Sequence, residues 1–194
     1  MKFVKTTVFS FVFLVSSLVS SAQLKLPITN NELRGNLSKV ISEFSNQFSE
    51  IKGPVTNENP QTTEYSSTLK FESAEDNVIT EYKGIKSIYS WQATLLTTED
   101  FEEANKKYKW LCNQLKVMTV TIDGHYSYSL DGKIDPAVES KAFSSSIFTL
   151  MPAASNLPRI RIEAGMQFQF PEWKVQLLVY EKERNDNERG PIKE

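Results

Sequence analysis

The sequence predicts an α+β protein in which two helices pack on one antiparallel sheet. Residues 159–180 alternate between apolar and polar side chains. Because the side chains of a strand point to opposite faces, this pattern buries one face and exposes the other. A break at Pro171 and Glu172 divides the stretch into a predicted hairpin. Two other segments, 29–53 and 97–118, carry apolar residues at helical spacing and are long enough to cover the apolar face.

The start of the chain reads as a secretory signal peptide covering residues 1–22. Lys2 and Lys5 form a basic start, an apolar run follows at residues 8–15, and small residues end the segment at Ala22. The next residue is Gln23, so the cysteine that a bacterial lipid anchor requires is not at the expected cleavage point. We therefore expect a free exported protein, periplasmic or secreted.

Charge and cysteine content narrow the possible partners. Loss of two signal-peptide lysines and no acid changes the formal net charge from -2 to -4. A mildly acidic chain without a basic stripe is not expected to bind nucleic acid or an anionic membrane. No second apolar run reaches the roughly 18 residues of a membrane span.

Cys112 is the only cysteine, which excludes an internal disulfide and favours a buried thiol over an intermolecular bridge or a reactive site.

In the first half of the chain, a capping box at residues 29–32 begins a helix that Gly53 and Pro54 end. Residues 55–63 are polar and contain a proline, which predicts a loop. Alternating patterns then predict three strands, at residues 65–71, 78–82 and 89–95.

In the second half, acids and threonines at residues 97–100 cap another helix that runs to Met118. Residues 118–142 are less regular and contain two Asp-Gly pairs, Asp123-Gly124 and Asp131-Gly132, which are typical of tight hairpin turns. A strand at residues 143–151 and a turn at 152–158 precede the hairpin. The hairpin positions expected to face the core are Ile160, Ile162, Ala164, Met166, Phe168, Phe170, Trp173, Val175, Leu177 and Val179.

The two halves also align with each other. Residues 65–69 match 143–147, and residues 91–96 match 173–178. The alignment predicts two helix-plus-three-strand repeats, at residues 29–96 and 97–181, within a single domain that spans residues 23–181. Residues 182–194 are nearly all polar and are expected to form a flexible tail.

Three runs carry a family resemblance: YSSTLKF at residues 65–71, IYSWQATLL at 88–96 and FEEANKKYKWLCNQL at 101–115. In their pattern of helix and strands they resemble uncharacterised exported proteins with a fold similar to the type III secretion chaperones. The resemblance covers about half of the mature chain. It implies a helix-and-sheet binding scaffold, and no family residue with a known role is transferred.

The sequence gives little support for a catalytic or a metal-binding site. His125 is the only histidine, and no nucleophile motif such as Gly-x-Ser-x-Gly accompanies it. Zinc sites need several His or Cys ligands, whereas this chain has one of each. Asp131, Asp135 and Glu139 have oxygen ligands at workable intervals for calcium, but the twelve-residue loop pattern is absent. We therefore expect neither a cofactor nor a metal.

The remaining candidate is the polar face of the sheet. If helices cover one face, long polar side chains occupy the other, either as a solvated surface or as a docking platform. The irregular segment would add specificity to such a platform. The candidate binding residues are Arg159, Arg161, Gln167, Gln169, Lys174 and Gln176 on the sheet, with His125, Tyr126 and Tyr128 on the loop.

The sequence thus favours an exported, non-enzymatic protein- or ligand-binding domain whose partner is another exported protein or peptide. Two alternatives stay open: an enzyme of unrecognised type that uses the His125 loop, and an inhibitor or structural component of the envelope. The identity of the partner, the oligomeric state and the role of residues 118–142 do not follow from the residues.

Overall fold

The computed structural model describes residues 30–71, 73–157 and 159–182. The predicted signal peptide, the capping residue Thr29 and the polar tail after Lys182 lie outside the described residues. Within those ranges, neither helix has the length and apolar character needed to cross a membrane.

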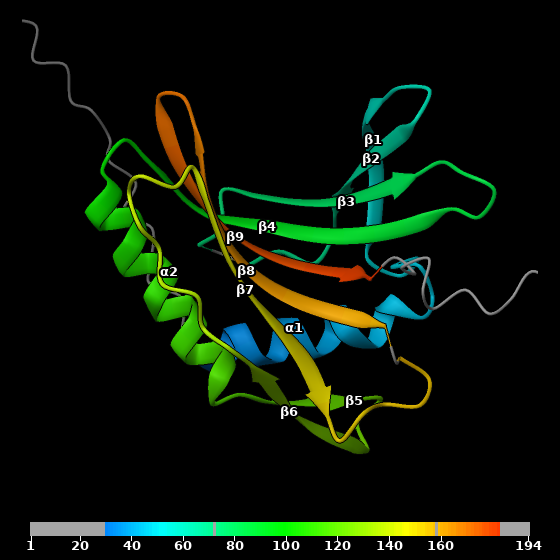
Figure 1. Cartoon of the computed structure of the whole chain (residues 1–194). Helices are drawn as coiled ribbons and strands as arrows, with labels where there is room; N and C mark the ends of the chain where they lie inside the picture. The colour runs from blue at the N-terminus through cyan, green and yellow to red at the C-terminus, as the bar shows by residue number, and fades with distance from the viewer. Residues whose placement is uncertain (1–29, 72, 158, 183–194) are drawn as a thin grey trace, which may run out of the picture.

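In the described residues, nine strands form one antiparallel sheet, in the order β1-β2-β3-β4-β9-β8-β7-β6-β5 (Figure 1). The last strands of the two halves, β4 and β9, pair at the centre of the sheet, and each half extends outward from them. The elements are α1 (Asn30–Phe44), β1 (Lys52–Glu58), β2 (Thr62–Ser67), β3 (Asp76–Tyr82), β4 (Ile88–Thr98), α2 (Phe101–Lys116), β5 (Thr119–Ile122), β6 (Tyr126–Gly132), β7 (Phe143–Met151), β8 (Ile160–Gln169) and β9 (Glu172–Glu181).

The predicted pair of helix-plus-three-strand repeats is wrong. Four strands follow α1 and five follow α2, and all nine belong to a single sheet that dominates the structure. The strand β1 lies in a stretch where Gly53 and Pro54 predicted a helix end and a loop. Proline lacks a donor for the ladder but is tolerated at an edge, and β1 is the edge strand of the sheet.

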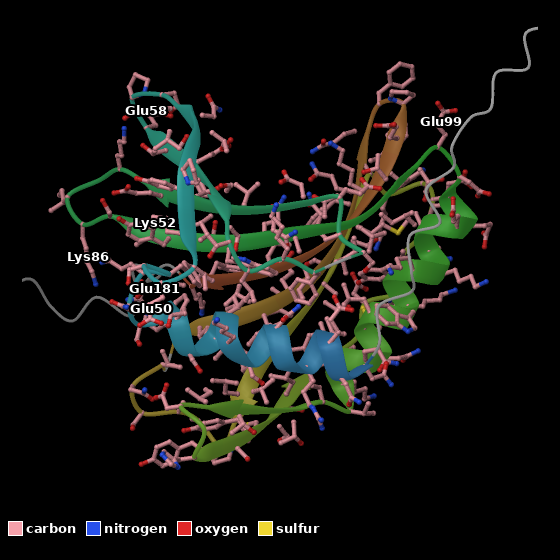
Figure 2. The ribbon with its side chains drawn as sticks, turned by 180° about the vertical axis from the view of Figure 1, so that it is seen from behind. Glu50, Lys52, Glu58, Lys86, Glu99 and Glu181 are labelled. Carbon is pink, nitrogen blue, oxygen red and sulfur yellow. The ribbon has the colours of Figure 1, made fainter. Side chains whose placement is uncertain are left out.

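Both helices pack on the same side of the sheet. Helix α1 contacts β5 and β9, and α2 contacts β4, β8 and β9. Figure 2, seen from behind, shows α1 in front of the strands, whereas the strands β7 and β8 lie nearest the viewer in Figure 1. The side that faces the viewer in Figure 1 is named the open face below.

The hairpin of β8 and β9 alternates as predicted over most of its length. From Ile160 to Met166 and from Trp173 to Val179, the apolar residues other than Leu178 are buried on the helix side. The tip differs, since Phe168 is only half-buried and Phe170 is 90% exposed. The tip projects beyond the body of the sheet (Figure 1). There the Phe168 ring packs against Trp173, with ring centroids 5.0 Å apart.

Trp91 on β4 lies at the centre of the core. Its side chain is fully buried, its ring centroid lies 5.4 Å from that of Phe71, and its indole N–H donates to the Ser67 hydroxyl over 3.2 Å. A large ring in this position fills space between the sheet and its cover, and its one polar atom has a partner, as burial requires.

Helix α1 ends earlier than its apolar spacing predicts. It stops at Phe44 instead of continuing to Gly53, and the chain turns through positive φ values at Gln47 and Phe48. Phe48 and Ile51 are nevertheless buried, so the spacing correctly marked core residues but not the helix that was expected to carry them.

The turn chemistry is confirmed at one Asp-Gly pair and wrong at the other. Asp123 and Gly124 have φ values of 53° and 69° and connect β5 to β6, as a tight hairpin turn requires. Asp131 and Gly132 instead lie inside β6. There, a side chain on Gly132 would collide with the Ile147 carbonyl and the Phe148 ring, which explains the glycine by close packing.

The two edges of the sheet are protected in different ways. At β5, the backbone amide of Thr121 donates to the Ser38 hydroxyl over 3.2 Å, and that of Asp123 donates to the Ser42 hydroxyl over 3.3 Å. Helix α1 thereby closes this edge. At β1, a proline and irregular pairing with β2 interrupt the regular ladder that another strand would need.

Replacement of Trp91 by Ala should lower the free energy of unfolding by about 3–5 kcal/mol, because it leaves a large cavity and removes the hydrogen bond that the indole donates to the Ser67 hydroxyl. Urea denaturation measures this loss. Trp110→Ala is the matched control: Trp110 is only half-buried on α2, where it lies beneath the Lys107 ammonium at 4.6 Å, and its loss should cost less than about 2 kcal/mol. Equal losses would show that Trp91 is not central to the core.

The double change Ser38→Ala and Ser42→Ala should open the β5 edge. Each removed hydroxyl acceptor should cost about 1 kcal/mol, and hydrogen exchange at the Thr121 and Asp123 amides should become faster. Ser49→Ala, an exposed serine beyond the end of α1, is the control. Unchanged exchange in the double variant would contradict closure of the edge by α1.

Candidate functional site

Five of the predicted binding residues share the open face. Gln167 on β8 pairs with Lys174 on β9, and Gln176 lies two residues further along β9. Arg161 is on the same side of β8, opposite Tyr180. Gln169, opposite Glu172, is exposed near the tip of the hairpin. The alternating pattern therefore placed these residues on the correct face.

Arg159 is not part of this polar surface. It precedes β8, and its guanidinium is fixed at the strand ends: Nε donates to the Lys182 carbonyl over 3.0 Å, and Nη1 lies 3.1 Å from the Glu181 carboxylate. The polar surface on β8 and β9 thus loses one of the cations that the sequence assigned to it.

The predicted specificity loop lies away from the polar surface as well. His125 and Tyr126 are exposed in the β5–β6 hairpin, at the edge of the sheet. Tyr128 has the same orientation as the buried Leu130 and packs against the core on the helix side. The structure therefore does not bring these residues together with Arg161, Gln167, Lys174 and Gln176.

The open face contains a groove of about 390 Å³ at the ends of the central strands. Its floor is formed by side chains that point away from the helices, mainly from β3, β4 and β9, with Glu163 from β8. We name it the face groove. It is lined by Thr80, Tyr82, Ile88, Tyr89, Ser90, Gln92, Glu163, Leu178, Tyr180, Glu181 and Lys182.

None of the predicted binding residues lines the face groove, but one sequence signal points to it. In the alternating hairpin, residue 178 belongs to the polar face, yet it is leucine and stands between Leu177 and Val179. In the structure Leu178 pairs with Gln92 on one side and Glu163 on the other. Together with Ile88, it gives the face groove an apolar part within an otherwise polar face.

The polar groups of the face groove are held in place. The Tyr180 hydroxyl donates to the Glu163 carboxylate over 2.7 Å. Burial, and then this carboxylate, raise the pKa of Tyr180 well above its ordinary value, so the phenol stays neutral and keeps donating. The groove thus combines a fixed acid and a fixed phenol with the apolar surface of Leu178 and Ile88.

A second cavity, of about 250 Å³, lies around the strand ends on the helix side. We name it the end cavity. Figure 2 shows Lys86 and Glu181 at this end of the molecule, beside the end of α1. It is lined by Phe44, Ser45, Gln47, Lys86, Ser87, Ile88, Tyr89, Asn156, Leu157, Arg159 and Glu181.

Next to the end cavity, a lysine is enclosed by two tyrosines. The Lys52 ammonium lies 4.9 Å from the ring centre of Tyr65 and 4.3 Å from that of Tyr89. The Tyr65 hydroxyl donates to Glu81 over 3.0 Å, and hydrogen bonds from Ser87, Tyr65 and Tyr89 lower the pKa of the Glu81 carboxyl. These cation–π contacts tie the edge strand β1 to β2 and β4.

The residues around Lys52 do not form a metal-binding site. The described residues contain no group of three His, Cys, Asp or Glu side chains that could hold a metal ion. Cys112, on α2, is fully buried, and burial raises the pKa of its thiol, as expected for a packing residue.

No protein-family model matches this sequence, and comparisons with curated proteins and with solved structures give no match. The resemblance to the secretion-chaperone fold is untested and stays a prediction.

Tyr89 should make stability depend on alkaline pH. Burial, and then Glu81, raise its pKa from 10.0 to about 12, so the folded state favours the neutral phenol. This contribution is complete below pH 10 and is lost as the pH rises towards about 12. In chemical denaturation over this range, Tyr89→Phe should lose less stability than the wild type, whereas Tyr126→Phe, at an exposed turn, should not. Equal losses in Tyr89→Phe and the wild type would contradict the burial of this phenol.

Proposed function

We propose that this chain is an exported, non-enzymatic binding domain that holds an extended segment of another protein on the open face of its sheet. The observation that carries the proposal is the face groove, which interrupts the polar surface with apolar side chains at the ends of β3, β4 and β9. Its volume of about 390 Å³ accommodates a few side chains and falls within the usual range of ligand sites.

The mixed lining of the face groove favours a polypeptide over a hydrocarbon chain. Leu178 and Ile88 offer apolar contacts, while Gln92 and Glu163 offer polar ones. A lipid tail would cover these polar groups without bonding to them, which costs free energy. The amide groups of a peptide supply the missing partners. Tyrosines, such as Tyr82 and Tyr180 here, are enriched among the residues that dominate binding energy at protein interfaces.

The alternative of an enzyme based on the His125 loop has less support. Neither the face groove nor the end cavity is lined by His125. An inhibitor would use the same groove as a binding domain, so it is a more specific version of the same proposal.

The groove is tested by selecting peptides from a random displayed library on the purified protein and measuring their affinities for variants. Leu178→Glu should weaken the selected peptides at least tenfold, because it places a charge in the apolar part of the groove beside Glu163. Gln176→Glu is the matched control, since Gln176 lies on the same face of the same strand but does not line the groove. It should change affinity less than threefold.

Thermal unfolding must show that both variants fold. Two outcomes would overturn the proposal: a library from which no peptide is enriched, or peptides that bind Leu178→Glu as tightly as the wild type. A loss confined to Gln176→Glu would instead move the site to the polar surface of Arg161, Gln167 and Lys174.

A further inference from the structure

We infer that the bound segment carries a carboxylate, which Lys86 and Arg159 receive in the end cavity. The inference rests on the proposed function, because it concerns the continuation of the face groove. Its starting observation is that Ile88, Tyr89 and Glu181 line both cavities. The two spaces therefore adjoin, and a ligand that leaves the face groove at the strand ends enters the end cavity.

The spacing fits a short stretch of extended chain. On β9, Leu178 in the face groove and Glu181 at the shared boundary are three residues apart, which is about 10 Å at the rise of a strand. An extended peptide covers this length in about three residues. When an apolar side chain of the peptide lies over Leu178, the peptide residue three to five positions further along therefore lies at the end cavity.

The end cavity has an excess of positive charge. Arg159 and Glu181 form an ion pair, so their charges compensate each other. Lys86 lines the same cavity, is exposed, and has no ion pair with any residue in the described part of the chain. The neighbouring Lys52 ammonium is enclosed by Tyr65 and Tyr89, which leaves Lys86 as the cation available to a ligand.

Arg159 would bind the carboxylate in a defined orientation. Its Nε and Nη2 donate to the Lys182 carbonyl and its Nη1 contacts Glu181, so the guanidinium is fixed before a ligand arrives. These contacts use three of the five N–H groups of an arginine. The remaining two suit an oxygen acceptor, and a prearranged donor loses little conformational entropy on binding.

The charge balance favours a carboxylate over a phosphate. Lys86, Arg159 and Glu181 together leave about one positive charge, which a single carboxylate neutralises. A phosphate group with nearly two negative charges would leave an excess of negative charge beside the Glu181 carboxylate. An Asp or Glu side chain and a peptide C-terminus present the same chemistry, so both are candidate sources.

The test uses two random peptide libraries, one displayed with free C-termini and one with both ends joined to the display protein. Selected peptides should carry an acid three to five residues from an apolar position. If only the library with free C-termini shows this dependence, the source is the terminal carboxylate; if both do, it is a side chain. Replacing the acid by its amide should weaken binding to the wild type about fivefold, the upper range for an exposed ion pair.

Lys86→Gln is the decisive variant. It should weaken acid-bearing peptides about fivefold and remove most of the difference between acid and amide peptides. Lys83→Gln is the matched control, because it removes the same charge from the same β3–β4 connection but pairs with Glu58 outside both cavities. It should behave like the wild type.

The inference is overturned if selected peptides show no acid at a constant spacing, or if the amide change weakens binding equally in the wild type and in Lys86→Gln. Neither result touches the proposed function, which fails only if Leu178→Glu leaves binding intact or no peptide is selected at all. The two failures are therefore distinguishable within one set of variants.

Discussion

The nine-stranded sheet has two faces, and in the described part of the chain two helices cover only one of them. The sequence meets this constraint by alternation: apolar residues point to the helices, and polar residues point to solvent, as in other antiparallel sheets with one wet face. The buried Trp91 and the apolar rows of β8 and β9 follow from the covered side. The surface available for binding follows from the other, because whatever the helices leave uncovered must be compatible with water.

The same constraint makes departures from alternation meaningful. Leu178 occupies a polar-face position at the centre of the sheet, and its neighbours across the ladder are Gln92 and Glu163. Further along that row, Ile147 on β7 is 43% exposed and pairs with Glu163. The open face is therefore not a uniform solvated surface. It has apolar positions separated by polar ones, which suits an extended polypeptide with both kinds of group better than a single apolar ligand.

Local pattern was enough to predict the β8–β9 hairpin, the core spacing of both helices, and the side of the sheet on which Arg161, Gln167, Lys174 and Gln176 lie. It failed wherever the outcome depends on what lies across the ladder. The strand β1 was missed because Pro54 is compatible with a strand only at an edge, and the local pattern does not show which strand forms the edge. Arg159 was assigned to the open face because the pattern alone does not show that Glu181 and the Lys182 carbonyl of the neighbouring strand hold it.

The groove itself depends on both faces of one strand. On β4, Ile88, Tyr89 and Ser90 all line the face groove, and the ring of Tyr89 also contacts the Lys52 ammonium on the helix side. Through Glu81 and Tyr65, these contacts connect β4 to β3, β2 and β1. The strand end that forms the floor is thus fixed by a hydrogen-bonded and cation–π cluster. Of its members Lys52, Tyr65, Glu81 and Tyr89, only Tyr89 lines the groove. A floor held in this way keeps its shape when empty, which reduces the entropy lost on binding and allows a shallow groove to discriminate between segments.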